Sequence, residues 1–472
     1  MILRKTKIVA TIGPASSSAT ILRQLVLSGV NVARLNFSHG TREGHKKLIT
    51  DIRKISLELD KPVAILQDLT GPRIRIGNLK DNRVFLKNGA VFKLTTEDIL
   101  GDAKRISVNY KYLPRDVKEG DTILIADGSV KVEVIGKSKT EISCKVRGGG
   151  FVSSKKGINL PFTKLKIPSL TAKDIKDLEL GIKCNVDFIA LSFVRSGADI
   201  KNAKEIIRKN GASIPVIAKI EKPEAVKNID EIIECSDGLM VARGDLGVEI
   251  PLEEIPRTQK MIIRKANLKG KPVITATQML RSMVENPEPT RAEVTDIANS
   301  VLDGTDAMML SEETAVGRYP VRAVRIMSRI AEKTEDYLPE KGFFYEKAAD
   351  EKKTIPDAIS QAACFAAFDL GAKVIITPTQ SGYSAMQVSR FRPRQPIIAV
   401  SPEIKTTRKL SLCWGVYPLL VDYFRNTDDM INKAKKVSLA SGLVRKGDTV
   451  VMTAGLPVGK SGTTNLVKAF II

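Results

Sequence analysis

Eight short apolar runs, separated by segments with helical periodicity, constrain the fold of this 472-residue chain more than any other feature. The runs are rich in Val, Ile, Leu and Ala, which is typical of strands buried on both faces of a parallel sheet. Eight such units in succession predict an α/β fold built on a (β/α)8 TIM barrel that ends near Leu338. The runs are KIVATIG (7–13), NVARLNF (31–37), VAILQDL (63–69), DFIALSF (187–193), PVIAKIE (215–221), GLMVARG (238–244), PVITATQ (272–278) and AMMLS (307–311).

Two parts of the chain do not follow this alternation of strands and helices. About a hundred residues between Gly71 and Pro168 hold short β-patterned runs and turns, too many for a loop, and predict a small β-barrel domain inserted after the third strand. After Leu338 a charged stretch leads into a second α/β pattern, which predicts a C-terminal α/β domain. The expected boundaries are 1–70 and 169–338 for the barrel, 71–168 for the insert, and 339–472 for the C-terminal domain.

The composition argues against a nucleic-acid-binding, membrane or secreted protein. The net charge is +22, but the basic residues are dispersed and aromatic residues make up only 5%, which favours small anionic ligands over nucleic acid. No apolar run is long enough for a membrane span, and we expect no export signal, because the first residues lack a continuous apolar stretch. The five cysteines form no CxxC pair, so we expect reduced thiols and a cytoplasmic location, without membrane or nucleic-acid partners.

The stretch AGLPVGKSG (454–462) is similar to a phosphate-binding loop. A catalytic loop of this kind opens a long helix, whereas only eleven residues follow Ser461 and they end in a strand pattern. The stretch is therefore predicted to be either a phosphate-binding turn for a regulatory ligand or a plain surface turn.

Polar residues follow the predicted barrel strands, where TIM barrels build their active sites. Since side chains alternate along a strand, Arg34 and Asn36 should share a face with Ser38, as should Lys219 with Glu221 and Arg243 with Asp245. The residues expected at this rim are Arg34, Asn36, Ser38, Asp68, Ser192, Arg195, Lys219, Glu221, Arg243, Asp245, Thr277, Ser311 and Glu313.

The residue types indicate the chemistry. Glu221 and Asp245 are oxygen ligands suited to Mg²⁺ or Mn²⁺, and with Arg34 and Lys219 they fit a phosphorylated, carboxylated substrate. Gly244 lets backbone amides approach an anion. Salt bridges lining the barrel mouth are the structural alternative. Elsewhere, His45 is expected to be a solvated loop residue.

The motifs TKIVATIGPAS (6–16), ARLNFSHG (33–40), IAKIEKPEAVKNIDEI (217–232), MVARGDLGVEIP (240–251), TATQML (275–280) and MLSEETAVGRYP (309–320) stand in this order. On these motifs the chain resembles the pyruvate kinases over nearly its whole length. The resemblance implies a central barrel, a lid-like insert and a C-terminal domain with an effector site, assembled as a homotetramer. It implies transfer of the phosphoryl group of phosphoenolpyruvate to ADP, giving pyruvate and ATP.

The resemblance also implies residue roles. Arg34 and Lys219 would meet the transferring phosphoryl group, Glu221 and Asp245 would hold the divalent metal, and Gly244, Asp245 and Thr277 would hold the substrate carboxylate. Thr277 would also lie where a proton reaches the enolate carbon. A second Mg²⁺ would arrive with the nucleotide, and ADP would be contacted by His39, Arg75 and Lys156.

Two departures from the family pattern lead to further expectations. The family's monovalent-cation motif DTKGPEIR reads DLTGPRIR here, so the region of Asn36, Ser38, Asp68, Leu69 and Arg73 carries a guanidinium where K⁺ would sit. We predict activity that does not require K⁺, because the fixed charge would repel that ion and replace it. In the C-terminal domain Tyr383 replaces an arginine of sugar-bisphosphate-activated relatives, leaving a phosphorylated effector possible at Thr379, Ser381, Ser384 and Lys460.

Two other functions stay open at this point. A metal-dependent barrel lyase or aldolase acting on pyruvate-type enolates could use the same metal, carboxylate seat and lysine, although it does not account for Arg75 and Lys156. A non-catalytic nucleic-acid or scaffold protein rests only on the +22 charge.

Overall fold

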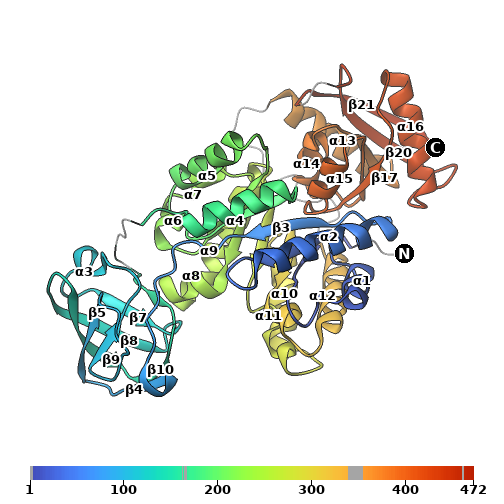
Figure 1. Ribbon diagram of the computed structural model, residues 1–472. Coiled ribbons are helices and arrows are strands. Elements are labelled where there is room, and N and C mark those ends of the chain that lie inside the picture. Colours follow the sequence, from blue (N-terminus) through green and yellow to red (C-terminus); the bar gives the residue numbers. More distant parts are fainter. Residues whose placement is uncertain (1–3, 162, 164–166, 339–353, 460–461) are drawn as a thin grey trace.

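Figure 1 shows the computed structural model, which describes residues 4–161, 163, 167–338, 354–459 and 462–472. A barrel occupies the middle of the molecule, the inserted domain lies at one end and the C-terminal domain at the other. The predicted (β/α)8 barrel is confirmed, with eight parallel strands in a closed ring. The strands are β1 (Lys7–Thr11), β2 (Val32–Asn36), β3 (Ala64–Asp68), β12 (Phe188–Leu191), β13 (Val216–Ile220), β14 (Gly238–Ala242), β15 (Val273–Ala276) and β16 (Ala307–Leu310).

The barrel strands are buried on both faces, which explains their continuous apolar sequences. Every residue of β13 is buried, including Lys219. Inward-facing Val9, Leu66, Met240 and others form a core inside the ring, while a second core lies between the ring and its helices. β1 closes the ring by pairing with β16, Lys7 opposite Ala307.

Helices surround the barrel, and local sequence signals fix where several of them begin. Thr171 and Thr290 each form a capping box with an acidic residue three positions later, which satisfies backbone amides at the helix start. The helices are α1 (Ala19–Leu27), α2 (Arg42–Glu58), α4 (Ala172–Lys183), α5 (Gly197–Lys209), α6 (Pro223–Lys227), α7 (Ile229–Cys235), α8 (Arg243–Glu249), α9 (Ile255–Leu268), α10 (Arg291–Leu302), α11 (Glu312–Ala315) and α12 (Pro320–Glu335), with 3₁₀ turns η2 (Leu252–Glu254) and η3 (Arg281–Val284).

The inserted domain is mostly β structure, as expected, with a hydrophobic core of its own. Its strands form a six-stranded sheet with β11 and β6 at its edges and a separate two-stranded sheet, and isolated bridges join Arg75 to Gly157 beside β11 and Ile76 to Val108 beside β6. The Ile158 amide in β11 donates to the Ile74 carbonyl, and the Gly77 amide donates to the Ser107 carbonyl in β6, so residues 74–77 join the two edges of the larger sheet, in agreement with the small β-barrel predicted. The elements are η1 (Lys80–Asn82), β4 (Arg83–Leu86), β5 (Val91–Thr95), β6 (Arg105–Ser107), α3 (Leu113–Asp116), β7 (Thr122–Ile125), β8 (Val130–Lys137), β9 (Glu141–Gly148), β10 (Gly150–Ser153) and β11 (Ile158–Asn159).

The C-terminal domain is the second α/β unit predicted. Its sheet has the order β19-β18-β17-β20-β21, and only β21 runs antiparallel. The final strand confirms that the loop-like stretch near Gly459 is followed by a strand, not a helix. The elements are α13 (Ile355–Asp369), β17 (Val374–Pro378), α14 (Tyr383–Ser389), β18 (Ile397–Ser401), α15 (Ile404–Leu410), β19 (Val416–Leu420), α16 (Thr427–Ala440), β20 (Thr449–Gly455) and β21 (Thr464–Ile471).

In the part of the chain that the structure describes, no helix is both long and apolar enough to cross a membrane.

Candidate functional site

Lys219 is the centre of a buried polar cluster at the carboxyl ends of the barrel strands. Its Nζ lies 2.8 Å from Ser192 Oγ, 2.9 Å from Glu221 Oε1 and 3.2 Å from Asp68 Oδ1. Burial acts to lower the pKa of Lys219, but Asp68 and Glu221 outweigh it and raise that pKa above its ordinary value. Lys219 therefore remains positively charged, which its predicted contact with a phosphorylated substrate requires.

Arg34 is fixed beside this cluster from β2. Its Nε donates to Asp68 Oδ2 at 2.7 Å and its Nη1 to Thr11 Oγ1 at 2.8 Å. Burial acts to raise the pKa of Asp68, yet Lys219 and Arg34 lower it below its usual range. One buried carboxylate thus orients two cations, and no described residue accepts from Arg34 Nη2.

The two carboxylates predicted to hold a metal come from adjoining elements. Glu221 directly follows β13, and its Oε2 accepts from the Phe193 amide at 2.8 Å. Burial raises the pKa of Glu221, and nearby Asp245 raises it further. Asp245 is therefore near enough for its charge to act on Glu221. Their chemistry fits Mg²⁺ or Mn²⁺, with remaining ligands supplied by substrate and water, because no larger cluster of His, Cys, Asp or Glu occurs among the described residues.

The expectation that Arg243 and Asp245 share a strand face is wrong. β14 ends at Ala242, and both residues belong to the first turn of α8, where positions two apart point in different directions. Arg243 accordingly turns away, with Nη1 2.7 Å from Asp296 Oδ1 and Nη2 2.8 Å from the Thr277 carbonyl oxygen.

Thr277 is held in an unusual conformation at the end of β15. Its φ is 70°, a left-handed conformation that is strained for a β-branched residue and that concentrates at functional sites. Its Oγ1 accepts from the Gly244 amide at 2.7 Å and donates to the Ala276 carbonyl at 2.6 Å. A Cβ at position 244 would lie 3.3 Å from this hydroxyl oxygen, so glycine there permits the close approach.

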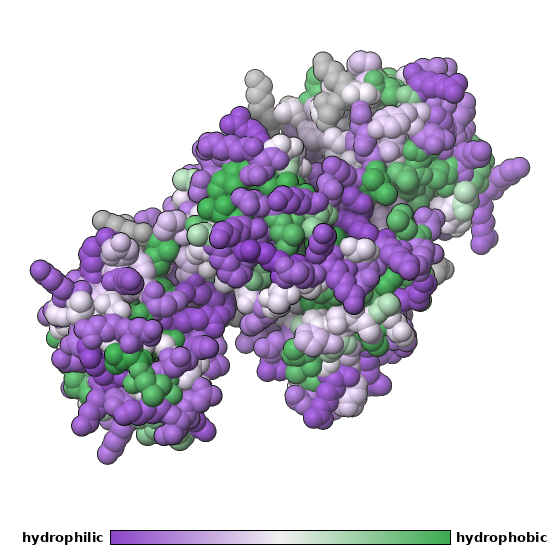
Figure 2. Space-filling view, in the orientation of Figure 1, coloured by the Kyte–Doolittle hydropathy of each residue, from purple (hydrophilic) through white to green (hydrophobic). Residues whose placement is uncertain are grey.

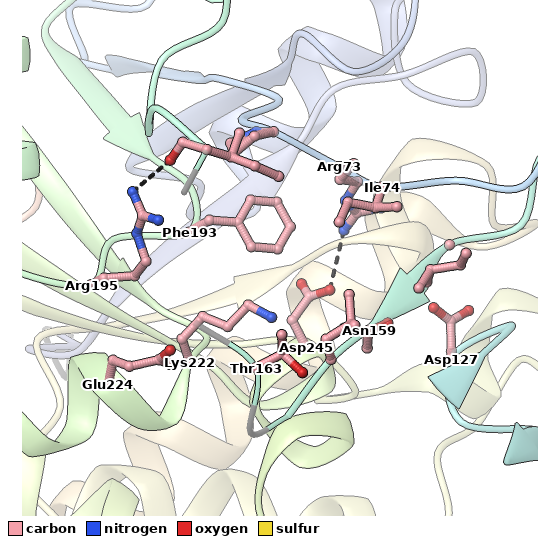
Figure 3. Close-up of a pocket in the computed structure, with 15 residues that line it drawn as sticks. Arg73, Ile74, Asp127, Asn159, Thr163, Phe193, Arg195, Lys222, Glu224 and Asp245 are labelled. Carbon is pink, nitrogen blue, oxygen red and sulfur yellow. Dashed lines mark hydrogen bonds and ion pairs between the residues drawn. The ribbon is translucent and has the colours of Figure 1, made fainter. Parts of the chain in front are cut away.

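Arg73 contacts one of the predicted metal ligands. Its ion pair is with Asp245, at 3.1 Å, and not with Asp68. Figure 3 shows the pair at a small cavity between the barrel rim and the inserted domain, with Phe193 and Lys222 on one side of it, Asn159 drawn next to Asp245 and Asp127 further out. The cavity measures about 60 Å³. The Asp127 and Asn159 side chains belong to the inserted domain, so that domain stands over the predicted metal ligands.

The other residues of the predicted monovalent-cation region lie at the ends of β2 and β3 and directly after them. Asn36 Oδ1 accepts from the Ser38 amide at 3.1 Å. Leu69 is 1% exposed and belongs to the hydrophobic core, so its side chain presents no oxygen ligand.

The predicted nucleotide-binding residues lie on two separate elements. His39 is exposed in the loop after β2, whereas Arg75 and Lys156 belong to the inserted domain, where Arg75 Nη1 donates to the neighbouring Lys155 carbonyl. His45 is not the solvated residue we expected. It is buried in α2, stacks on Phe37 with ring centroids 4.0 Å apart, and its Nε2 lies 2.8 Å from the His39 carbonyl oxygen.

Sequence reasoning missed several residues that complete the rim. The hydroxyl of Thr11 holds Arg34, and buried Glu249 on α8 accepts from Asn159 of the inserted domain at 2.9 Å. Glu313 was expected at the rim, but its role is structural: it accepts from the backbone amides of Ser311 and Leu280. One indication of the role of Thr11 was available in the sequence, because this residue places a hydroxyl at the end of the first strand.

The predicted effector residues surround a second cavity, of about 160 Å³, in the C-terminal domain. Thr379, Ser381 and Ser384 all line it, and Ser384 Oγ lies 2.8 Å from Thr464 Oγ1. Lys460 lies outside the described residues. Arg425 also lines this cavity and was missed.

Known proteins resemble this chain over nearly its whole length. The sequence matches the family description "Pyruvate kinase, barrel domain" over residues 3–324 and "Pyruvate kinase, alpha/beta domain" over residues 357–470. It is 48% identical to a pyruvate kinase from Geobacillus stearothermophilus, over 99% of this chain and 80% of that protein. It is 46% identical to one from Clostridium acetobutylicum, over the full length of both. A solved pyruvate kinase structure from Cryptosporidium parvum superposes with a TM-score of 0.94 at 40% identity, covering 99% of this chain and 96% of that one.

Proposed function

The chain belongs to the pyruvate kinase family of phosphotransferases, and from this premise we propose that it transfers the phosphoryl group of phosphoenolpyruvate to ADP. Residues 1–70 and 169–338 would form the catalytic barrel, 71–168 a lid, and 339–472 a regulatory domain. We place the enzyme in the cytoplasm as a homotetramer, in keeping with its free cysteines and the family resemblance.

The observation that carries the proposal is the surrounding of Lys219. A buried ammonium kept charged by Asp68 and Glu221 is a fixed positive group beside the predicted metal ligands. Phosphoryl transfer passes through a loose transition state, so positioning and charge stabilisation contribute most of the catalysis. Lys219 and Arg34 would bind the transferring phosphoryl oxygens, Arg34 through the Nη2 that no described residue engages.

Glu221 and Asp245 would hold Mg²⁺ or Mn²⁺. When bound, the ion neutralises charge on the phosphoryl and enolate oxygens. Without a metal, each carboxylate is stabilised by a cation, Asp245 by Arg73 and Glu221 by Lys219. On metal binding, Asp245 would release Arg73, and Glu221 would give up part of its contact with Lys219.

The first turn of α8 and Thr277 would seat the substrate carboxylate. The backbone amides at Gly244 and Asp245 open the turn, and the Thr277 hydroxyl already contacts the Gly244 amide. During transfer the bond between phosphorus and the enol oxygen breaks, and a bond to the terminal phosphate oxygen of ADP forms. The enolate carbon then takes a proton, which we assign to a relay through the Thr277 hydroxyl, and pyruvate results.

The lid residues Arg75 and Lys156, with His39 from the barrel, would bind ADP and its Mg²⁺. The inserted domain is attached to the barrel rim by contacts such as Asn159 with Glu249. Closure of such a domain excludes water from the phosphoryl group, which protects it from hydrolysis.

We also propose that K⁺ is not required. The Leu69 side chain offers no oxygen to a monovalent ion, and Asp68 already has two cationic partners. Arg73 adds a permanent charge at Asp245. A rate that rises manyfold when K⁺ replaces a bulky organic cation contradicts this proposal.

The cavity around Thr379, Ser381 and Ser384 would receive a phosphorylated effector. Arg425 supplies a cation at its wall, and Lys460 would add a second.

A coupled assay tests the main proposal. Pyruvate formed from phosphoenolpyruvate and ADP is followed with lactate dehydrogenase, and Lys219→Met should remove most of the turnover while substrate binding remains. Aldol or lyase activity without ATP formation, or salt-sensitive nucleic-acid binding without turnover, would instead support the alternatives raised by the sequence.

A further inference from the structure

His45 is a buried histidine that no function proposed above uses. It lies near the start of α2, directly after the loop of residues 37–41 that follows β2. Hydrophilic surface covers the solvent side of α2 in Figure 2, and Lys46 and Lys47 are exposed there, whereas His45 is only 8% exposed. Its ring is therefore turned towards the loop and away from solvent.

The ring of His45 holds this loop at two points. It stacks on Phe37 with ring centroids 4.0 Å and planes 12° apart, and its Nε2 lies 2.8 Å from the His39 carbonyl oxygen. Gly40 has a φ of +77°, which favours glycine, and a Cβ there would lie 3.4 Å from Nε2. One ring thus contacts the loop on both sides of Ser38.

The hydrogen bond to the His39 carbonyl fixes the tautomer of His45. A carbonyl oxygen only accepts, so Nε2 carries the proton and Nδ1 carries none. Nδ1 is buried without a partner among the described residues, and burial lowers the pKa of His45, which favours the neutral ring. A phenyl ring would stack on Phe37 and leave no unpaired nitrogen. The donor at Nε2 is therefore what an imidazole adds at this position.

The Phe37 end of the loop has other partners, whereas the His39 carbonyl depends on His45. The Phe37 carbonyl accepts from Lys173 Nζ at 2.7 Å, and the Phe37 amide donates to the Asp68 carbonyl at 3.0 Å. Within the described parts of the chain, His45 supplies the only hydrogen bond to the His39 carbonyl. Without this bond the carbonyl of His39 loses the contact that fixes its direction.

We propose that His45 is a positioning residue for the nucleotide. The inference rests on the proposed function, in which the exposed His39 binds ADP. By donating to the His39 carbonyl, His45 fixes the backbone that carries this side chain before ADP arrives, which lowers the entropic cost of binding. Lys219 and Arg34 are oriented by Asp68 and not by this loop, so the contact affects ADP far more than phosphoenolpyruvate.

Titration calorimetry of the full chain with ADP and excess Mg²⁺ tests the proposal. His45→Phe keeps a stacked ring but no donor, and it should weaken ADP binding about five- to tenfold, within the range of one hydrogen bond. The KM for phosphoenolpyruvate should stay within about twofold of the wild type. His45→Gln keeps a donor near the Nε2 position, and its ADP affinity should stay within about twofold.

A second perturbation reaches the same contact from the exposed side of the loop. Gly40→Ala tests the proposal even where His45→Phe destabilises the fold, and it should weaken ADP binding about threefold or more. The double variant should bind ADP within about twofold of His45→Phe alone, because both changes act on one contact. Ile52→Ala is the matched control, since Ile52 is buried on α2 two turns beyond His45; it should lower stability but keep ADP affinity within about twofold.

Three results overturn the proposal: wild-type ADP affinity in His45→Phe, an equal loss of affinity in Ile52→Ala, or equal increases in the KM values of both substrates. A wild-type chain that forms no pyruvate would refute the proposed function instead, and calorimetry with ADP would still measure the role of His45.

Discussion

The ion pair between Arg73 and Asp245 leads to a quantitative prediction about metal binding. The guanidinium occupies a carboxylate that the divalent ion would use, so the ion has to displace it. The Arg73 side chain is 40% exposed and that of Asp245 28%, and ion pairs of this exposure are worth about 0.5–1 kcal/mol. Replacing Arg73 with Met removes this competition and should tighten the dissociation constant for Mn²⁺ about two- to fivefold.

Electron paramagnetic resonance of Mn²⁺, titrated into the enzyme without substrate, measures this constant directly. The difference between the two proteins should shrink as salt is raised, because screening weakens exposed ion pairs. Arg147→Met is a matched control, since Arg147 pairs with Glu133 at 2.7 Å on the inserted domain with comparable exposure. Equal or weaker Mn²⁺ binding in Arg73→Met, with the control unchanged, would refute the reasoning.

Three further predictions follow from the described contacts. Lys219→Met should lower kcat by about 10³-fold or more, because a preorganised charge is lost. The KM for phosphoenolpyruvate should change far less. A rise in KM as large as the fall in kcat would contradict the assigned role. Arg73→Glu, which restores the family's residue, should make the rate rise several-fold on adding K⁺ to a K⁺-free coupled assay, and a flat response argues against replacement of K⁺ by the guanidinium. Lys7 is fully buried, and burial first, then Arg4, lowers its pKa from 10.5 to about 7. Between these values the unfolded chain carries a proton that the folded chain has lost, so this group makes stability rise with pH, by up to about 1.4 kcal/mol per pH unit. Urea unfolding at pH 7 and pH 9 should show this gain in the wild type but not in Lys7→Met, and an equal gain in both proteins would exclude Lys7 as its source.

The barrel could be predicted from the sequence because its strands are buried on both faces. A run such as VIAKI in β13 is apolar apart from one lysine, and all five residues are buried. The same reasoning identified Lys219 and Glu221 together, since both follow the pleat of one strand. Burial and alternation are local properties, so a single sequence reveals them.

Contacts between distant elements could not be predicted in this way. The letters VARGD continue a strand pattern, yet the chain turns into α8 after Ala242, and Arg243 and Asp245 separate as a result. The ion pair of Arg73 with Asp245 and the stacking of His45 on Phe37 depend on tertiary packing, which the periodicity of a sequence does not predict. The orientation of Arg408 by Asp187 likewise depends on two domains meeting.

The closure of the ring between β1 and β16 has a consequence for synthesis. Lys7 pairs with Ala307, so the ring cannot be completed until nearly two thirds of the chain has left the ribosome. Until then the nascent sheet has open edges, which in general invite pairing with other chains. The inserted domain has its own core and can fold during this interval, so translation speed between β12 and β16 would decide how long the edges stay unprotected.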